Sequence, residues 1–147
     1  MRRTLILAVS ALFIAVPMLA RADLAPPPDT YTGPASAHIA DLSFERKRIR
    51  HFGPASAPEN RRYPQGYGTY VFLADCNASS ENCSRAQEAN ALGAAVTKVD
   101  GVEIGDNVQA LQNALDSGDH TLTLVAASDV IVQPDDPKEI SLSVSVP

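Results

Sequence analysis

The stretch Val96-Thr97-Lys98-Val99-Asp100-Gly101-Val102-Glu103-Ile104 decides the fold because it encodes two short strands joined by a tight turn. β-Branched residues dominate both halves, and Asp-Gly between them is a strong signal for a hairpin turn. A helix is predicted directly afterwards. Asp106 or Asn107 can cap it and Gly118 can end it, and its apolar face recurs at helical spacing through Val108, Leu111 and Leu115.

Further elements are predicted on both sides of this unit. Residues 69–74 are apolar and β-branched, typical of a strand buried on both faces, and 84–92 is an alanine-rich helix that ends at Gly93. Downstream, 121–126 and 130–132 are predicted strands, and 140–146 alternates apolar residues with serine. That alternation predicts a half-buried strand of an antiparallel sheet. The order of elements predicts an α+β domain, a small antiparallel β-barrel or sandwich with two helices packed on it.

The N-terminal part of the chain has a different composition. Residues 1–22 combine a basic start, a short apolar run and small residues before a cleavage position, which predicts a secretory signal peptide rather than a membrane anchor. Residues 23–62 are interpreted as a Pro-rich tether and basic arm, with a possible first strand near 39–52, and 63–147 as the folded domain. We therefore expect a periplasmic or secreted protein with no stable membrane insertion once the signal is removed.

The charge of the chain excludes two classes of partner. Without Arg2, Arg3 and Arg21 the chain would hold nine basic and 17 acidic residues, a net charge of −8. Such a protein repels nucleic acid and anionic membranes. One local exception is the basic run from Arg46 to Arg50, which is interpreted as a solvated strand face, with a binding patch as the alternative.

Cys76 and Cys83 are the only cysteines and flank a polar segment. Because export would place them where disulfides persist, we predict that they form a structural bridge. Closing so short a loop stabilises the fold by about 2–3 kcal/mol in the chain-entropy estimate. The redox-catalyst alternative requires a Cys-x-x-Cys spacing, which this pair lacks. Two cysteines and three scattered histidines also make a poor zinc site, so no metal site is predicted.

The C-terminal segments resemble a known family. Residues 96–104 resemble the "ITxVDGxxV" strand-turn-strand of bacterial PDZ domains of the HtrA-like periplasmic type, and 107–115 occupy the place of the second PDZ helix. Residues 118–124 resemble the following "GDTVTLTV" strand, and 138–144 resemble the closing "KEITLTV" strand. The chain departs from the family at Gly93-Ala94, where Gly-Asp is usual, and in having no protease domain. The resemblance implies a degenerate PDZ-like fold.

The resemblance also implies a mode of binding. A PDZ domain adds an extended peptide to an open sheet edge beside its second helix. Here the edge would be residues 67–74 or the strand near Ile49–Phe52, facing the helix at 107–117. A carboxylate-binding loop would lie at Gly66–Thr69 or at His51–Pro54. The implied peptide-binding residues are Tyr67, Gly68, Tyr70, Asn107 and Leu111, although Leu111 also fits a plain core position.

We therefore expect a protein that is not an enzyme and that uses no cofactor. His38, His51 and His120 are the only bases of neutral pKa, and they suggest no catalytic triad. The leading interpretation is an exported module that binds a protein or peptide partner in the cell envelope. The alternatives are a structural component of an envelope or secretion assembly, and a small secreted protease inhibitor that presents the Cys76–Cys83 loop.

Overall fold

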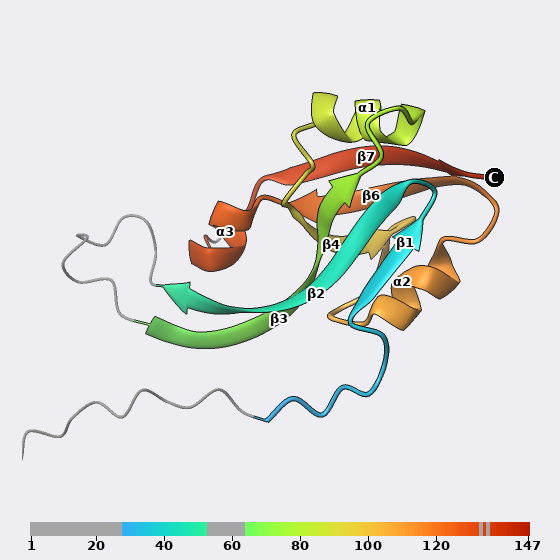
Figure 1. Cartoon of the computed structure of the whole chain (residues 1–147). Helices are drawn as coiled ribbons and strands as arrows, with labels where there is room; N and C mark the ends of the chain where they lie inside the picture. The colour runs from blue at the N-terminus through green and yellow to red at the C-terminus, as the bar shows by residue number, and fades with distance from the viewer. Residues whose placement is uncertain (1–27, 53–63, 133, 135) are drawn as a thin grey trace, which may run out of the picture.

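The computed structural model describes residues 28–52, 64–132, 134 and 136–147 and shows one α+β domain (Figure 1). The predicted signal peptide therefore lies outside the described residues. The elements are β1 (Ser36–Ile39), β2 (Leu42–Phe52), β3 (Pro64–Cys76), α1 (Glu81–Glu88), β4 (Ala95–Val99), β5 (Val102–Glu103), α2 (Val108–Ala114), β6 (Gly118–Val125), α3 (Ala127–Val132) and β7 (Glu139–Val146). The strands form one antiparallel sheet in the order β1-β2-β3-β4-β6-β7, with β5 paired to β4.

The hairpin and helix predicted from residues 96–115 are confirmed. Asp100 and Gly101 join β4 to β5 with φ angles of 49° and 81°, the left-handed backbone that a two-residue hairpin turn of this kind requires. Asn107 is the residue that caps α2, because its side chain accepts a hydrogen bond of 3.0 Å from the Ala110 N–H.

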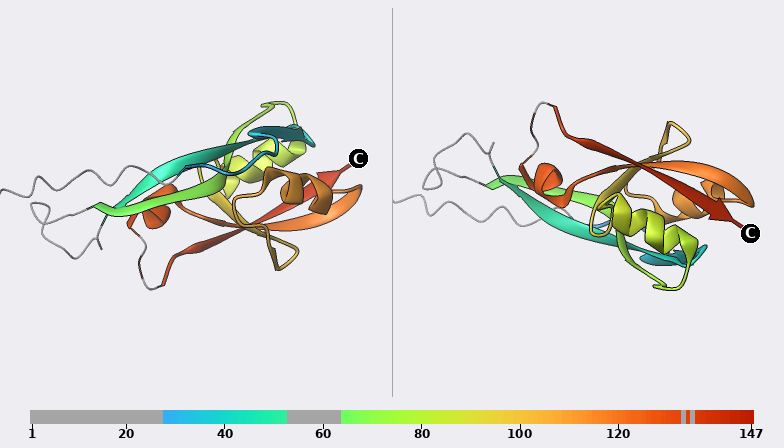
Figure 2. Two further views of the ribbon diagram at one scale, coloured as in Figure 1. Left: turned by 90° about the horizontal axis from the view of Figure 1, so that it is seen from below. Right: turned by 90° about the horizontal axis from the view of Figure 1, so that it is seen from above.

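The main hydrophobic core lies inside the strongly curved sheet. Figure 2 shows β2–β3 and β6–β7 as two layers, with α2 beside them. The larger fully buried side chains between these layers are Leu42, Phe44, Val71, Leu73, Val96, Val99, Val108, Leu111, Leu122, Leu124, Leu142 and Val144. In β7 the apolar residues point inward and the serines outward, as the alternation predicted.

A second apolar cluster covers the opposite face of the sheet. Phe72 and Val125 pack there with Val130 of α3. Residues 130–132 were predicted as a strand, and that prediction is wrong because they belong to this helix. Their β-branched side chains favour a strand locally, but packing of Val130 on the sheet outweighs that weak preference.

The predicted barrel is also wrong, because β1 and β7 end the sheet and do not pair with each other. Three helices rather than two accompany the sheet in the described residues. One side chain bridges the gap between the two ends of the sheet: the Asn82 amide nitrogen of α1 donates to the Ala40 carbonyl at 3.0 Å and to the Ser145 carbonyl at 2.9 Å. The sheet is thus not a closed barrel, but the Asn82 side chain connects the turn after β1 to the C-terminal end of β7.

The Cys76–Cys83 disulfide is present, with the two Cα atoms 5.3 Å apart. It connects the end of β3 to the first turn of α1. This helix begins earlier than predicted, since Ser80 caps it by accepting from the Cys83 N–H at 3.0 Å. The segment between the cysteines is therefore partly helical rather than a simple loop. No helix among the described residues is long and apolar enough to cross a bilayer.

Beyond the core, β2 and β3 continue together as a two-stranded arm, defined here as residues 47–52 and 64–70. Strand β1 pairs with β2 only from Leu42 to Glu45, and β4 pairs with β3 only at Val71 and Phe72. The arm therefore has no neighbouring strand on either side among the described residues, and Figure 1 shows it extending away from the body. Residues 36–52 were predicted to belong to the Pro-rich N-terminal segment, with a possible first strand near 39–52. In the structure they form β1 and β2 of the sheet.

Candidate peptide-binding edge

The sheet edge beside α2, where the resemblance placed a peptide, is filled by the chain itself. Strand β1 pairs antiparallel with β2, from Ser36 opposite Glu45 to Ile39 opposite Leu42, and α2 contacts both strands. Ala40 and Asp41 make the turn between them, each with a positive φ. The expectation that residues 67–74 form this edge is wrong, because β2 and β1 lie between β3 and that edge.

Arg46 contacts residues 29–35, the segment that precedes β1. Its guanidinium forms an ion pair with Asp29, contacts Asp106 at 2.6 Å and lies 4.2 Å from the centroid of the Tyr31 ring. Its backbone N–H also donates to the Ala35 carbonyl at 2.8 Å. The Arg46 contact lowers the pKa of Asp29 from 3.8 to about 2. These contacts hold residues 29–35 against β2, so the α2 side of the sheet is closed in this structure.

The five residues expected to bind a peptide lie on two elements. Tyr67, Gly68 and Tyr70 are on β3, in the arm, whereas Asn107 and Leu111 belong to α2 and its cap. Asn107 caps the helix, and Leu111 is fully buried in the main core. These two side chains therefore have structural tasks. A peptide-binding role of the three β3 residues stays a prediction.

Gly68 has a clear packing role. A Cβ atom at this position would lie 2.6 Å from Cε1 of His51 and 2.8 Å from Cε2 of Tyr70. The two rings approach each other over the glycine, and the Tyr70 hydroxyl lies 2.9 Å from His51 Nε2. Burial lowers the pKa of His51 and so favours its neutral form. The glycine is thus explained by the close approach of two side chains.

The sheet is open along β1 and along β7 at its two ends, and both strands of the arm lack an outer neighbour among the described residues. Of these edges, the outer edge of β7 lies beside α1. This strand pairs with β6 on one side only. At its C-terminal end, the Asn82 side chain accepts from the Ser145 N–H at 3.0 Å and donates to the Ser145 carbonyl at 2.9 Å. Ser145 therefore points its backbone groups away from β6. Because these directions alternate along an antiparallel strand, the N–H and C=O groups of Ser143 and Ser141 face outward as well.

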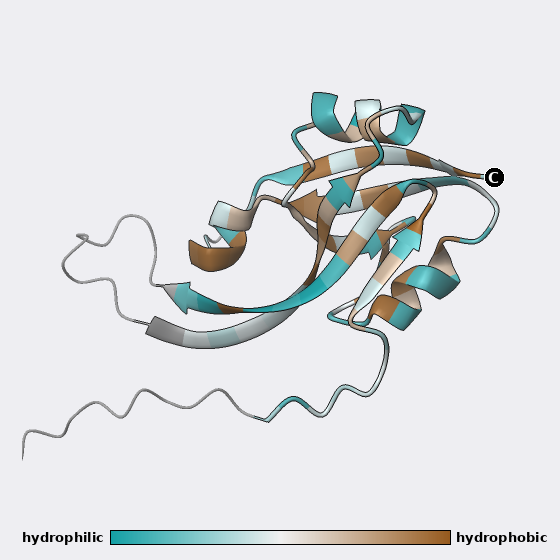
Figure 3. Cartoon of the chain, in the orientation of Figure 1, coloured by the Kyte–Doolittle hydropathy of each residue, from teal (hydrophilic) through white to brown (hydrophobic). Residues whose placement is uncertain are grey.

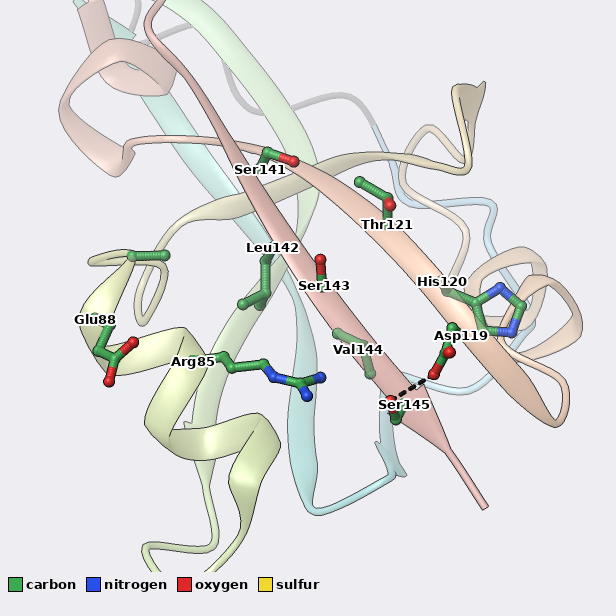
Figure 4. Close-up of a pocket in the computed structure, with 11 residues that line it drawn as sticks. Arg85, Glu88, Asp119, His120, Thr121, Ser141, Leu142, Ser143, Val144 and Ser145 are labelled. Carbon is green, nitrogen blue, oxygen red and sulfur yellow. Dashed lines mark hydrogen bonds between the residues drawn. The ribbon is translucent and has the colours of Figure 1, made fainter.

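A groove accompanies this edge, with a volume of about 730 Å³. Its wall on the α1 side carries Arg85, Glu88 and Ala89, and its floor is β7 with the neighbouring part of β6. Figure 4 shows the Arg85 guanidinium directed toward β7 and the serine side chains along the strand. The arrangement is an edge strand beside a helix, which is what strand addition requires, but at the opposite end of the sheet from the predicted site.

His120 lines this groove, and both of its ring nitrogens form hydrogen bonds. Its Nδ1 lies 2.7 Å from an Asp100 carboxylate oxygen, and its Nε2 lies 2.9 Å from the Asp116 carbonyl oxygen. These acceptors raise the pKa of His120, the hydrogen bond to Asp100 having the largest effect. Both ring nitrogens are engaged as donors in the protonated ring, so neither is available as a general base.

We expect His120 to make the folded protein less stable as the pH rises. Its raised pKa means that its contribution is complete below the ordinary value of 6.5 and is lost as the pH passes through the folded-state value. Urea unfolding at about pH 5.5 and pH 8.5 measures this. His51 acts in the opposite sense because its pKa is lowered. The change in the free energy of unfolding between the two pH values is therefore compared between the wild type and His120→Gln. His38→Gln, a substitution at an exposed site, is the control. An unchanged pH dependence in His120→Gln would contradict the assignment.

Two of these features have no local signal in the sequence. Asn82 lies in a polar stretch with several similar residues, and only the folded chain brings it to both Ala40 and Ser145. The serines of β7 marked a solvent-facing side, but the position of the strand at the sheet edge depends on pairing with β6. In contrast, the two-residue turn before β2 could have been suspected from the short separation of two strand-like segments.

Comparison with known proteins gives no further assignment: no family model matches the chain, and neither a curated protein nor a solved structure is significantly similar to it.

Proposed function

We propose that this chain is a non-catalytic module of the cell envelope that binds an extended segment of a partner protein by β-strand addition. The observation that carries the proposal is the outer edge of β7, which has no strand partner among the described residues at Ser141 and Ser143 and faces a groove beside α1. Main-chain hydrogen bonds would supply affinity at such an edge, and the groove walls would supply selectivity.

Asn82 supports the proposal because its side chain forms the same hydrogen bonds to the Ser145 backbone that a residue of a bound strand would form. Its amide accepts from the N–H and donates to the C=O of the same residue, as a residue of a neighbouring strand does. It also marks where an incoming strand must stop. Alternate residues on a strand are about 6.8 Å apart, so a segment of four or five residues would pair with Ser141 and Ser143.

The PDZ-like interpretation is retained as part of this proposal, with a different location for the ligand. The order of β2, β3, α1, β4, β5, α2, β6 and β7 is compatible with the order that the resemblance implies. Binding beside α2 would require β1 to leave its place on β2, together with the contacts of Arg46. The β7 edge requires no such rearrangement. The predicted signal peptide and the disulfide support a periplasmic or secreted location.

A second candidate function is a structural part of an envelope assembly without peptide specificity. The specific observation in its favour is β1, which fills the edge where a PDZ domain would take its ligand. In this case the domain would dock as a rigid body, and its edges would not need to select a sequence.

The experiment compares Ser143→Pro with Ser143→Ala. Proline removes the outward N–H and leaves the ladder to β6 intact, because the Ser143 N–H faces away from β6. Alanine removes only the hydroxyl. Peptides selected on the wild type from a displayed library of random linear decapeptides are then synthesised, and their affinities are measured for all three proteins. We expect Ser143→Pro to weaken binding at least 10-fold and Ser143→Ala to change it less than 2-fold.

Two outcomes would contradict the proposal. Equal binding by Ser143→Pro and the wild type would place the peptide elsewhere on the protein. Failure to enrich any peptide above the level obtained with an unrelated protein would exclude recognition of linear segments and would favour the structural role. Circular dichroism of both variants separates a loss of binding from a loss of folding.

A further inference from the structure

The arm has a basic side formed by alternate residues of β2. Arg46, Arg48 and Arg50 lie opposite Val71, Thr69 and Tyr67 in the register with β3. Because opposed residues of an antiparallel pair share one face, the three arginines project from the same face of the sheet. No acidic residue occurs in 47–52 or 64–70. Figure 3 shows the far part of β2 as mostly hydrophilic, with one apolar band, whereas apolar bands recur along the strands of the body.

Each face of the arm has a different environment. On one face, α3 contacts β2, and Lys47 and Ile49 line a cavity with Ala127 and Ile131. The other face holds Arg48, which is exposed, and Arg50, whose guanidinium lies 5.9 Å from the centroid of the Tyr67 ring. We name Arg48, Arg50, Tyr67 and Thr69 the basic face.

The contacts of Arg46 indicate that arginines on this face bind carboxylates. It is the first of the three and already holds two carboxylates, those of Asp29 and Asp106, while Tyr31 stacks on it. The positive charge of Arg48 also helps to lower the pKa of Asp29. The chain's own acidic segment thus occupies the beginning of the row, and the exposed Arg48 is the next arginine along it.

We infer that the basic face of the arm binds an acidic, extended segment of a partner protein. Charge complementarity favours carboxylates, because planar guanidinium groups hold them through paired hydrogen bonds. A narrow segment is favoured over a nucleic acid or a bilayer, since the chain as a whole carries an excess of acidic residues and would repel a broad polyanion. Glutamates at every second position would match the spacing of Arg48 and Arg50, about 6.8 Å along a strand.

The test uses two synthetic peptides of equal composition, one that alternates five glutamates with five threonines and one that has five glutamates followed by five threonines. Fluorescence anisotropy at low salt measures their affinity for the full mature chain. We expect the alternating peptide to bind at least 5-fold more tightly than the block peptide. Arg48→Glu should weaken its binding at least 10-fold, whereas Lys138→Glu, an equal charge change at an exposed site on the body, should change it less than 2-fold.

Four results would overturn the inference. These are the absence of measurable binding by the wild type, equal losses in Arg48→Glu and Lys138→Glu, and equally tight, Arg48-dependent binding of heparin or of phosphatidylglycerol vesicles. The fourth is self-association of the wild type without peptide that Arg48→Glu abolishes, which would assign the face to a second copy. The failure of this test is distinguishable from failure of strand addition at β7, because Ser143→Pro should bind the alternating peptide normally.

Discussion

Leu111→Ala should lower the free energy of unfolding by about 3 kcal/mol, because the side chain is fully buried and its removal leaves a cavity in the main core. Leu111→Asp should leave the chain unfolded, since it would bury an unpaired charge among apolar side chains. Urea denaturation followed by circular dichroism measures both effects.

Val102→Ala is the matched control for Leu111→Ala, because it also shortens an apolar side chain, but one that is 68% exposed. We expect it to change stability by less than about 0.5 kcal/mol. The resemblance to a PDZ domain placed Leu111 in a binding groove. A Leu111→Ala variant with wild-type stability and altered peptide binding would support that placement and contradict the packing described above.

Asn82→Ala should be the most damaging substitution of a polar side chain on α1. It removes three hydrogen bonds, to the Ala40 carbonyl and to both backbone groups of Ser145, and leaves their partners without a replacement. At about 1 kcal/mol for each bond, we expect a loss of about 3 kcal/mol. The exposed Asn113→Ala on α2 controls for the loss of an amide and should change stability by less than about 0.5 kcal/mol.

Asn82→Ala should also affect the two ends of the sheet together. The side chain joins the turn before β2 to the end of β7, which are far apart in the sequence. Hydrogen exchange should therefore quicken at the Ser145 amide, where the partner is lost. If Asn82→Ala unfolds with wild-type stability and the Ser145 amide stays protected, the bridge is not a stabilising feature.

The fold was predictable where local signals and burial agree. The Asp100-Gly101 turn, the capped helix after it and the alternation in β7 each have one simple physical cause, and all three are confirmed. The α+β class follows from their order. Prediction of 130–132 as a strand was wrong because it rested on side-chain preference alone, and the packing of Val130 on the sheet decides its conformation.

The candidate site was less predictable, because it depends on which edges remain unpaired. Nothing local in Ser36–Ile39 indicates that this segment covers β2 beside α2, where a ligand was expected. Likewise, the serines of β7 predict a wet face but not an open edge. Sheet order and long-range contacts such as those of Asn82 and Arg46 arise only when the whole chain folds.

Amide hydrogen exchange at Ser143 and Ser145 in the free protein tests most directly whether the β7 edge is available. Both residues lie in the same strand, but within the described part of the chain only Ser145 has its outward N–H bonded, to Asn82. An open edge at β7 predicts rapid exchange at Ser143, slow exchange at Ser145, and slowing at Ser143 and Ser141 when a selected peptide binds. Slow exchange at Ser143 in the free protein, or protection on binding that is confined to β1 and α2, would contradict it.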